Sequence, residues 1–117
     1  MIDEVEEGMI KINGKKYTFD VWLFGDGRVM QRDMTLSKDN KISVEEVQVI
    51  LDNSPDIVAI ILGTGQKTHI GVSDEARKLL EKKKKIAIWD YNTEDAVKVY
   101  NDQISKGVKV AAIFHLN

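Results

Sequence analysis

The sequence predicts an α/β fold, in which the strands of a sheet are joined by helical crossovers. Two patterns predict it. In the second half of the chain, short apolar runs typical of strands buried on both faces alternate with capped helical segments. In the first third, apolar and polar residues alternate around turn signals, which favours antiparallel strands. With 117 residues, 43% of them hydrophobic, and no internal repeat or linker, we expect one domain over residues 1–117.

The first elements are antiparallel strands linked by two turns. Residues 8–12 alternate apolar and polar, and the Asn-Gly pair at 13–14 then supplies the positive φ angles that a two-residue hairpin turn needs. We expect residues 16–24 to form the returning strand, with aromatic side chains on both of its faces. The Gly-Asp-Gly sequence at 25–27 predicts a second turn, and residues 28–32 a third strand.

Three helices follow, each marked by a capping residue. Ser43 begins the first, which ends near residue 53, and Glu46 completes a capping box three residues after the cap. Ser73 and Thr93 cap the second and third helices, and acidic residues follow both in the first turn, where they suit the helix dipole. Gly107 is placed to end the third helix.

Three apolar runs alternate with these helices and predict the strands of the central sheet. They span residues 57–62, 86–89 and 110–114 and are rich in β-branched side chains. We expect them to be adjacent strands, largely inaccessible to water, with helices packed on both faces.

Composition excludes several classes of function. The formal net charge of −2 argues against nonspecific binding to nucleic acid, which requires a basic surface. The absence of cysteine excludes disulfides and cysteine-ligated metals, and two histidines, His69 and His115, leave little for another metal centre. We therefore expect no metal and no other cofactor.

The same features predict where the protein works. No stretch reaches the roughly 18 apolar residues of a membrane span, so we expect no membrane association. The acidic N-terminus has the features of neither a signal peptide nor a transit peptide, which favours a cytoplasmic protein. Lysine far outnumbers arginine and is accompanied by many glutamates, a bias typical of thermophiles.

A glycine pair imitates the start of a dinucleotide-binding motif. Gly63 and Gly65 follow a predicted strand, and Asp90 ends the next one. However, Thr68 occupies the position of the third glycine, and the cap at Ser73 lies too far along the chain for a helix to begin directly after the turn. The pyrophosphate would therefore lose its helix N-terminus, which argues against a nicotinamide or flavin cofactor.

The same loop is nevertheless the best candidate for a ligand site. Ligands of open α/β sheets bind at the carboxyl ends of strands, where glycines let backbone N–H groups approach and a helix N-terminus favours an anion. The predicted ligand-binding residues, for a small anionic metabolite, are Gly63, Thr64, Gly65, Gln66, Lys67, Asp90 and Thr93. The plainer interpretation is that the glycines only permit a turn, while Asp90 and Thr93 only cap a helix.

Other charged and polar features favour structural roles. The lysine run 82–85 is typical of a solvated helix end. Arg28 and Arg32 share one face of a strand, where we expect salt bridges. His115 or His69 could pair with an aspartate, but no serine lies in a nucleophile elbow, so catalytic residues stay unknown.

Several short motifs together resemble a known family. In their order and spacing they are similar to a family of small domains of unknown function that includes the mitochondrial complex I assembly factor three and the adipogenesis-associated Mth-domain-containing protein. The resemblance implies three layers, with a mixed central sheet flanked by helices and an additional N-terminal β-hairpin layer. It carries over no catalytic residue. The motifs are Gly8, Asn13-Gly14-x-x-Tyr17, Asp20-Val21, Ile60-Ile61-Leu62-Gly63-Thr64-Gly65, Asp90, Thr93-x-x-Ala96-x-x-x-Tyr100-Asn101 and Val110-Ala111-Ala112.

Two classes of function follow. The first is a noncatalytic binding or assembly protein, which we favour because the sequence carries little catalytic chemistry. The second is a small-molecule binder or enzyme that uses the cleft at Gly63-Thr64-Gly65. Aromatic residues on both faces of strand 16–24 also predict a homo-oligomer, alongside a protein partner. Without a targeting segment, we do not expect a role in respiratory complex assembly.

Overall fold

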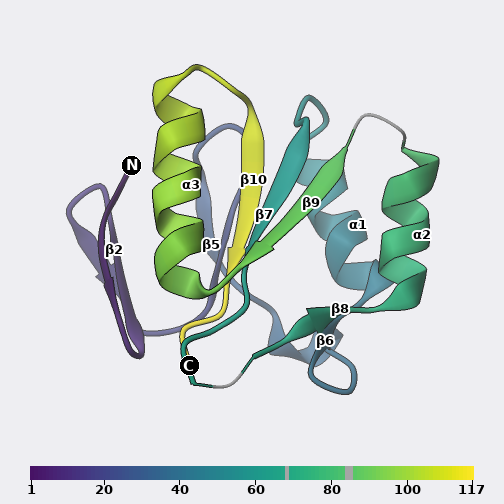
Figure 1. Cartoon of the computed structure of the whole chain (residues 1–117), viewed down its shortest axis with the longest axis horizontal. Coiled ribbons are helices and arrows are strands. Elements are labelled where there is room, and N and C mark those ends of the chain that lie inside the picture. The colour runs from purple at the N-terminus through teal and green to yellow at the C-terminus, as the bar shows by residue number, and fades with distance from the viewer. Residues whose placement is uncertain (68, 84–85) are drawn as a thin grey trace.

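A computed structural model gives the fold (Figure 1) and describes residues 1–67, 69–83 and 86–117. The interpretations placed on Thr68 and on the end of the lysine run, Lys84 and Lys85, lie outside these residues. In chain order the elements are β1 (Ile2–Glu6), β2 (Met9–Ile12), β3 (Lys15–Tyr17), β4 (Val21–Leu23), β5 (Val29–Gln31), a 3-10 turn (Met34–Leu36), β6 (Lys41–Ile42), α1 (Val44–Asn53), β7 (Ala59–Gly63), β8 (Gly71–Val72), α2 (Asp74–Lys82), β9 (Ala87–Tyr91), α3 (Thr93–Ser105) and β10 (Val110–Phe114).

The central sheet is mixed and has the strand order β5-β4-β10-β7-β9. Strands β10, β7 and β9 are parallel to one another, whereas β4 is antiparallel to both of its neighbours, β10 and β5. The three apolar runs therefore lie side by side, as predicted. Helix α3 covers one face, α1 and α2 cover the other, and the sheet β1-β2-β3 lies outside α3 (Figure 1). This arrangement confirms the predicted layers.

Each face of the central sheet carries its own hydrophobic core. Along β4, Val21 points into the core beneath α3, whereas Trp22 points into the core beneath α1 and α2. Neighbouring residues Ile60 and Ile61 of β7 divide in the same way, and both are 0% exposed. Alternating side chains of a strand thus meet a separate layer of helices on each face.

Residues 16–24 do not form the single strand that was predicted. Strand β3 ends at Tyr17 in the three-stranded sheet, and β4 begins at Val21 in the central sheet, because the chain passes from one sheet to the other. Trp22 and Phe24 are each only 2% exposed. Tyr17 is half-buried and Phe19 is 37% exposed, so the expectation that aromatic residues of this segment stay unburied is wrong for Trp22 and Phe24 but not for Phe19. The homo-oligomer stays a prediction.

Strand β9 is also less buried than predicted. It is an edge strand of the central sheet, and Ala87, Asp90 and Tyr91 are exposed while Ile88 and Trp89 are half-buried. An apolar run indicates a strand but does not fix its position in the sheet. The prediction of a largely inaccessible strand is wrong here, since β9 has a neighbouring strand on one side only among the described residues.

The local signals for turns and caps are mostly confirmed. Asn13 has φ 49° and Gly14 φ 84°, in the two-residue turn between β2 and β3. The hydroxyls of Ser43 and Ser73 accept hydrogen bonds from helical N–H groups, as predicted. The third helix differs, because Asn92 is its N-cap and Thr93 is already helical.

One long-range contact fixes the N-terminal strand. Asn101 of α3 accepts a hydrogen bond from Ile2 N–H (2.9 Å) and donates one to the Ile2 carbonyl (2.8 Å). Strand β1 was not predicted, because its acidic residues conceal the alternation that pairs it with β2.

Within the described segments, no helix is long and apolar enough to cross a bilayer.

Candidate functional site

The central sheet collects polar residues at the edge where its parallel strands end. His115 follows β10, and the antiparallel strands bring Asp20, just before β4, and Arg32, just after β5, to the same edge. Val21 pairs with Phe114, so Asp20 and His115 leave their strands at neighbouring positions. The topology thus juxtaposes three ionisable side chains that are far apart in sequence.

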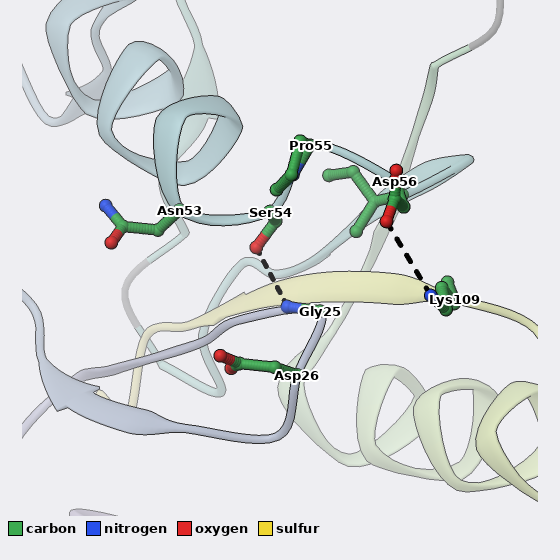
Figure 2. A pocket seen from close by; sticks show the side chains of 8 residues that line it. Gly25, Asp26, Asn53, Ser54, Pro55, Asp56 and Lys109 are labelled. Carbon is green, nitrogen blue, oxygen red and sulfur yellow. Dashed lines mark hydrogen bonds and ion pairs between the residues drawn. The ribbon is translucent and has the colours of Figure 1, made fainter.

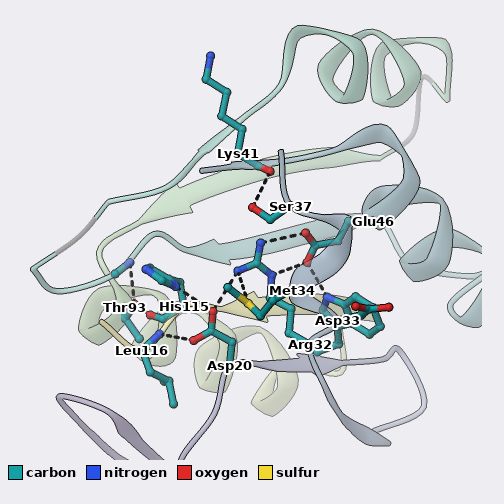
Figure 3. A network of polar contacts seen from close by, with 12 residues as sticks. Asp20, Arg32, Asp33, Met34, Ser37, Lys41, Glu46, Thr93, His115 and Leu116 are labelled. Atoms are coloured by element: carbon teal, nitrogen blue, oxygen red, sulfur yellow. Dashed lines mark hydrogen bonds and ion pairs between the residues drawn. The ribbon is translucent and has the colours of Figure 1, made fainter. Parts of the chain in front are cut away.

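These side chains form a buried charge cluster of Asp20, Arg32, Glu46 and His115 (Figure 3). The guanidinium of Arg32 donates to both carboxylate oxygens of Glu46, from Nε at 2.6 Å and from Nη2 at 3.0 Å. Its Nη1 donates to Asp20 Oδ2 at 3.0 Å, which also lies 2.8 Å from His115 Nδ1. The indole N–H of Trp22 donates to Glu46 at 2.7 Å.

The electrostatics favour the charged forms of Asp20 and Arg32. Burial alone would raise the pKa of Asp20, but hydrogen bonds from His115 and the Leu116 N–H, with the charge of His115, hold that pKa below its ordinary value. Burial would lower the pKa of Arg32, but its hydrogen bonds to Glu46 and Asp20, together with their charges, raise that pKa above its ordinary value. Asp20 and Arg32 are therefore an ion pair at neutral pH, and the salt bridges expected for Arg32 are confirmed.

A His–Asp pair is the core of many general-base sites, but this one is enclosed. His115 is 6% exposed, and its Nε2 has no hydrogen-bond partner among the described residues. A general base must reach the proton it abstracts, and His115 is not among the residues that line the grooves and cavities described below. Nor do the described residues hold three His, Asp or Glu side chains arranged for a metal.

The predicted ligand loop lies beside this cluster, with its backbone N–H groups already bonded. Thr64 N–H donates to the Tyr91 carbonyl at 2.8 Å, and Gly65 N–H donates to Thr93 Oγ1 at 2.9 Å. Gln66 N–H donates to the carbonyl of Asn117 at 3.0 Å. The donors expected to approach an anion thus bind the protein itself.

The side chains of the predicted site are also engaged. The Thr93 hydroxyl donates to the His115 carbonyl at 2.6 Å. Lys67 lies 3.1 Å from Glu7, and Asp90 turns to α2, where it pairs with Arg77 at 3.1 Å. The fold therefore brings Thr93 and the loop 63–66 together but directs Lys67 and Asp90 elsewhere. Ligand binding at this loop stays a prediction.

The two glycines have structural reasons to be there. A Cβ atom on Gly63 would lie 2.9 Å from the ring of Phe114 and 3.2 Å from Thr93 Oγ1, so no side chain fits. Gly65 has φ 117°, which other residues rarely adopt. Close packing and backbone conformation thus account for both glycines.

A small cavity lies at the opposite edge of the sheet (Figure 2). Its volume is about 150 Å³, and the Gly25 N–H donates to Ser54 Oγ at its wall, at 2.8 Å. Lys109 lies 3.7 Å from Asp56 on the far side. Ligand pockets of proteins are roughly 300–1,000 Å³, so this cavity is too small for a metabolite of ordinary size.

Larger grooves flank the exposed strand β9 on both faces. The groove toward α2 has a volume of about 370 Å³ and is lined by Arg77, Leu80, Glu81 and residues 86–88. The groove toward α3 measures about 380 Å³ and is lined by Trp89, Tyr91, Lys98, Val99, Asp102 and Gln103. Sequence reasoning missed this surface, because it predicted that β9 would be buried.

Comparison with known proteins gives a family without an assigned activity. The family model described as "Protein of unknown function (DUF498/DUF598)" matches residues 2–115. A conserved hypothetical protein from Pyrococcus horikoshii is 27% identical, with a TM-score of 0.88 over 100% of this chain and 98% of its own. No curated protein matches the chain.

Two further solved structures share the fold at lower identity. The protein MT938 is 24% identical, with a TM-score of 0.83 over 100% of this chain and 97% of its own. A protein from Bordetella pertussis, described as a Mth938-like domain, is 16% identical, with a TM-score of 0.72 over 98% of this chain and 84% of its own. These similarities confirm the α/β architecture.

Proposed function

Because this chain belongs to the DUF498/DUF598 family of proteins of unknown function, its role has to be derived from its own surfaces. We propose that it is a noncatalytic binding protein that adds a strand of a partner protein to the edge of its central sheet, at β9. Strand addition of this kind uses the main chain for affinity and flanking grooves for specificity.

The observation that carries the proposal is a row of backbone groups on β9 that faces away from β7 and has no neighbouring strand among the described residues. Ala87 N–H donates to the Val58 carbonyl, and the Tyr91 carbonyl accepts from Thr64 N–H, so both residues face β7. Residues along a strand alternate in direction, and Ile88 and Asp90 therefore point their N–H and C=O groups away from the sheet. Grooves on both faces can take the side chains of an added strand.

The rest of the molecule supports a role without catalysis. The His115–Asp20 pair is buried, and the N–H groups of the loop 64–66 bind protein acceptors. Kinship with the mitochondrial complex I assembly factor three and the adipogenesis-associated Mth-domain-containing protein also forms part of the proposal, without a role in respiratory complex assembly.

The test uses a pair of substitutions at one exposed position. Asp90→Pro removes an outward N–H without touching the bonds to β7, whereas Asp90→Ala removes the same side chain and keeps that N–H. Random peptides displayed on phage are selected on the wild-type protein. The selected peptides should bind Asp90→Ala almost as well, and bind Asp90→Pro at least about tenfold more weakly.

Two results of this experiment would count against the proposal. Peptides that bind both variants equally, or a selection that enriches none, would contradict strand addition at β9. The circular dichroism spectrum of Asp90→Pro must match that of the wild type. If it does not, Ile88→Pro, which also removes an outward N–H, takes its place, with Ile88→Ala as its control.

A second candidate function is the predicted binding of a small anion beside Thr64, Gly65 and Gln66. One observation favours it, because the side-chain nitrogen of Gln66 and Nε2 of His115 are buried without partners in the described structure. Phosphate and carboxylate compounds should then raise the melting temperature of the wild type. Gln66→Ala, which removes that side-chain nitrogen, should reduce the rise, and a panel without any effect would exclude the site.

A further inference from the structure

We propose that the strand added at β9 is β9 of a second copy of this chain, paired antiparallel about a two-fold axis at Trp89. This inference rests on the proposed function and names the partner. The pairing would join two five-stranded sheets into one continuous sheet across the dimer. Its basis is that β9 is complementary to itself in backbone groups and side-chain size, in a register that keeps the two Asp90 carboxylates from facing each other.

Among the described strands, β9 is the edge least protected against pairing. Edges β3 and β5 have three residues each, and β6 and β8 two each. Strand β1 has five residues, but it carries a register irregularity and three acidic residues, which are devices that protect an edge. Strand β9 has five residues in regular register with β7 and a single charge, Asp90.

The free backbone groups of β9 complement those of a second β9. With Trp89 opposite Trp89 of the second copy, Ile88 of each strand lies opposite Asp90 of the other. Both residues point outward, so each opposed pair exchanges two hydrogen bonds, and the two pairs form about four in total. No outward group of Ile88 or Asp90 is left unpaired in this register.

Neighbouring registers are less favourable. Centring the pair on Ile88 would place each Asp90 opposite Ile86, whose N–H already donates to the Lys83 carbonyl, so the Asp90 carbonyl would lack a donor. Centring it on Asp90 would bring the two Asp90 carboxylates face to face, which is destabilising. Backbone pairing and charge thus select the register centred on Trp89.

The side chains fit the same register. Trp89 lies at a position where opposed side chains approach most closely, so the two indoles meet beside the groove toward α3. Ala87 lies opposite Tyr91 of the second copy, which places a small residue against a large, exposed ring. Asp90 is paired with Arg77 at 3.1 Å, so its charge is compensated where it meets Ile88 of the second copy.

Engineered thiols test this register directly, because the chain contains no cysteine. Opposed residues of this kind have Cα atoms about 4.5 Å apart, within the range of a disulfide. Trp89→Cys alone should therefore form a disulfide dimer under mild oxidation. Ala87→Cys alone should not, since its two copies are about 13 Å apart, whereas Ala87→Cys mixed with Tyr91→Cys should cross-link.

The mixed pair keeps Trp89 and remains informative if Trp89→Cys disturbs folding. Cross-linking of Ala87→Cys with itself, or no cross-linking of the mixed pair, would overturn the proposed register. Sedimentation of the uncross-linked protein should give a dimer for the wild type and for Asp90→Ala. For Asp90→Pro the dissociation constant should rise at least about tenfold.

Failure of this inference is distinguishable from failure of the proposed function. A wild type that stays monomeric at high micromolar concentration overturns the self-pairing. Selected peptides would still discriminate Asp90→Pro from Asp90→Ala if another protein supplies the strand. Equal peptide binding by both variants would instead remove β9 as the binding edge.

Discussion

At the scale of single residues, the buried charge of Arg32 has a large desolvation cost that its partners must offset. The Arg32 side chain is 0% exposed and is held by the carboxylates of Asp20, just before β4, and Glu46 of α1. Removing a charge from water costs several kcal/mol, and the attraction of the partners offsets this only when the geometry is good and the remaining donors are bonded. The bidentate contact with Glu46 meets that condition.

Glu46→Gln should therefore destabilise the protein strongly. The substitution keeps the shape of the side chain but leaves Arg32 with one carboxylate instead of two, and breaking a buried pair costs about 3–5 kcal/mol. Urea unfolding at neutral pH measures the change. Glu45→Gln is the matched control, because Glu45 lies next in sequence but forms an exposed pair with Lys38. Equal effects of the two substitutions would contradict the role of Glu46.

Asp20 should make stability depend on acidic pH. Its pKa is lower in the folded protein than the ordinary value of 3.8, so the unfolded chain binds the proton more tightly. The stabilisation by Asp20 is present above that value and is lost as the pH falls through the folded pKa. Unfolding free energies of wild type and Asp20→Asn, measured between about pH 2 and 5, should converge at the acid end. A constant difference would contradict the assignment.

At the scale of elements, the position of β9 decides what it can do. The run at residues 86–89 is as apolar as an inner strand, but β9 has a neighbouring strand on one side only in the described structure. One row of its backbone groups is bonded to β7 and the other faces solvent. Two kinds of amide hydrogen therefore alternate along one strand.

Hydrogen exchange should reveal this alternation. The N–H of Ala87 donates to the Val58 carbonyl and should exchange slowly, whereas those of Ile88 and Asp90 should exchange fast in dilute solution. In the sheet interior, Ile60 and Ile113 should exchange most slowly of all. Uniform protection along β9 in the monomer, or fast exchange at Ile60, would contradict this strand order.

The sequence predicted those elements whose signals are local. Caps such as Ser43 and Ser73 act within one helical turn, and the Asn13-Gly14 turn depends on two adjacent φ angles, so each was predicted correctly. The buried charge cluster could not be found in this way, because strand pairing brings its members together from distant positions. The predicted capping box is confirmed for the Ser43 hydroxyl, but the carboxylate of Glu46 binds Arg32 and Trp22 instead, which nothing nearby in sequence indicates.

Strand order is likewise absent from local patterns. The apolar run of β9 predicted a strand correctly, but whether a strand lies inside a sheet or at its edge depends on the rest of the topology. The family resemblance carried information of a different kind. It implied the mixed sheet and the outer hairpin layer, and membership of a family of unknown function is confirmed.

At the scale of the whole molecule, two hydrophobic cores share one sheet. Each inner strand contributes alternate side chains to both cores, so neither can loosen without disturbing the backbone that supports the other. Trp89 borders the core beneath α3, and Trp22 lies in the core beneath α1 and α2. We therefore expect both cores to unfold together.

Paired substitutions in β7 test this coupling. Ile61→Ala opens a cavity in one core and Ile60→Ala in the other, each at a cost of about 2–5 kcal/mol. In both variants, tryptophan fluorescence and circular dichroism should give coincident unfolding transitions. A transition in which one probe precedes the other would mean that the cores unfold separately.

The central position of β10 has a consequence for the order in which the protein can fold during synthesis. This strand follows the other described strands in sequence, yet it lies between β4 and β7 and bonds to both. A nascent chain that lacks it holds β4-β5 and β7-β9 as separate pairs, with the inner edges of both uncovered. Asn101 likewise cannot fix Ile2 until α3 has been made. A ribosome-bound chain should therefore stay sensitive to protease until β10 leaves the exit tunnel, and then become resistant in a single step.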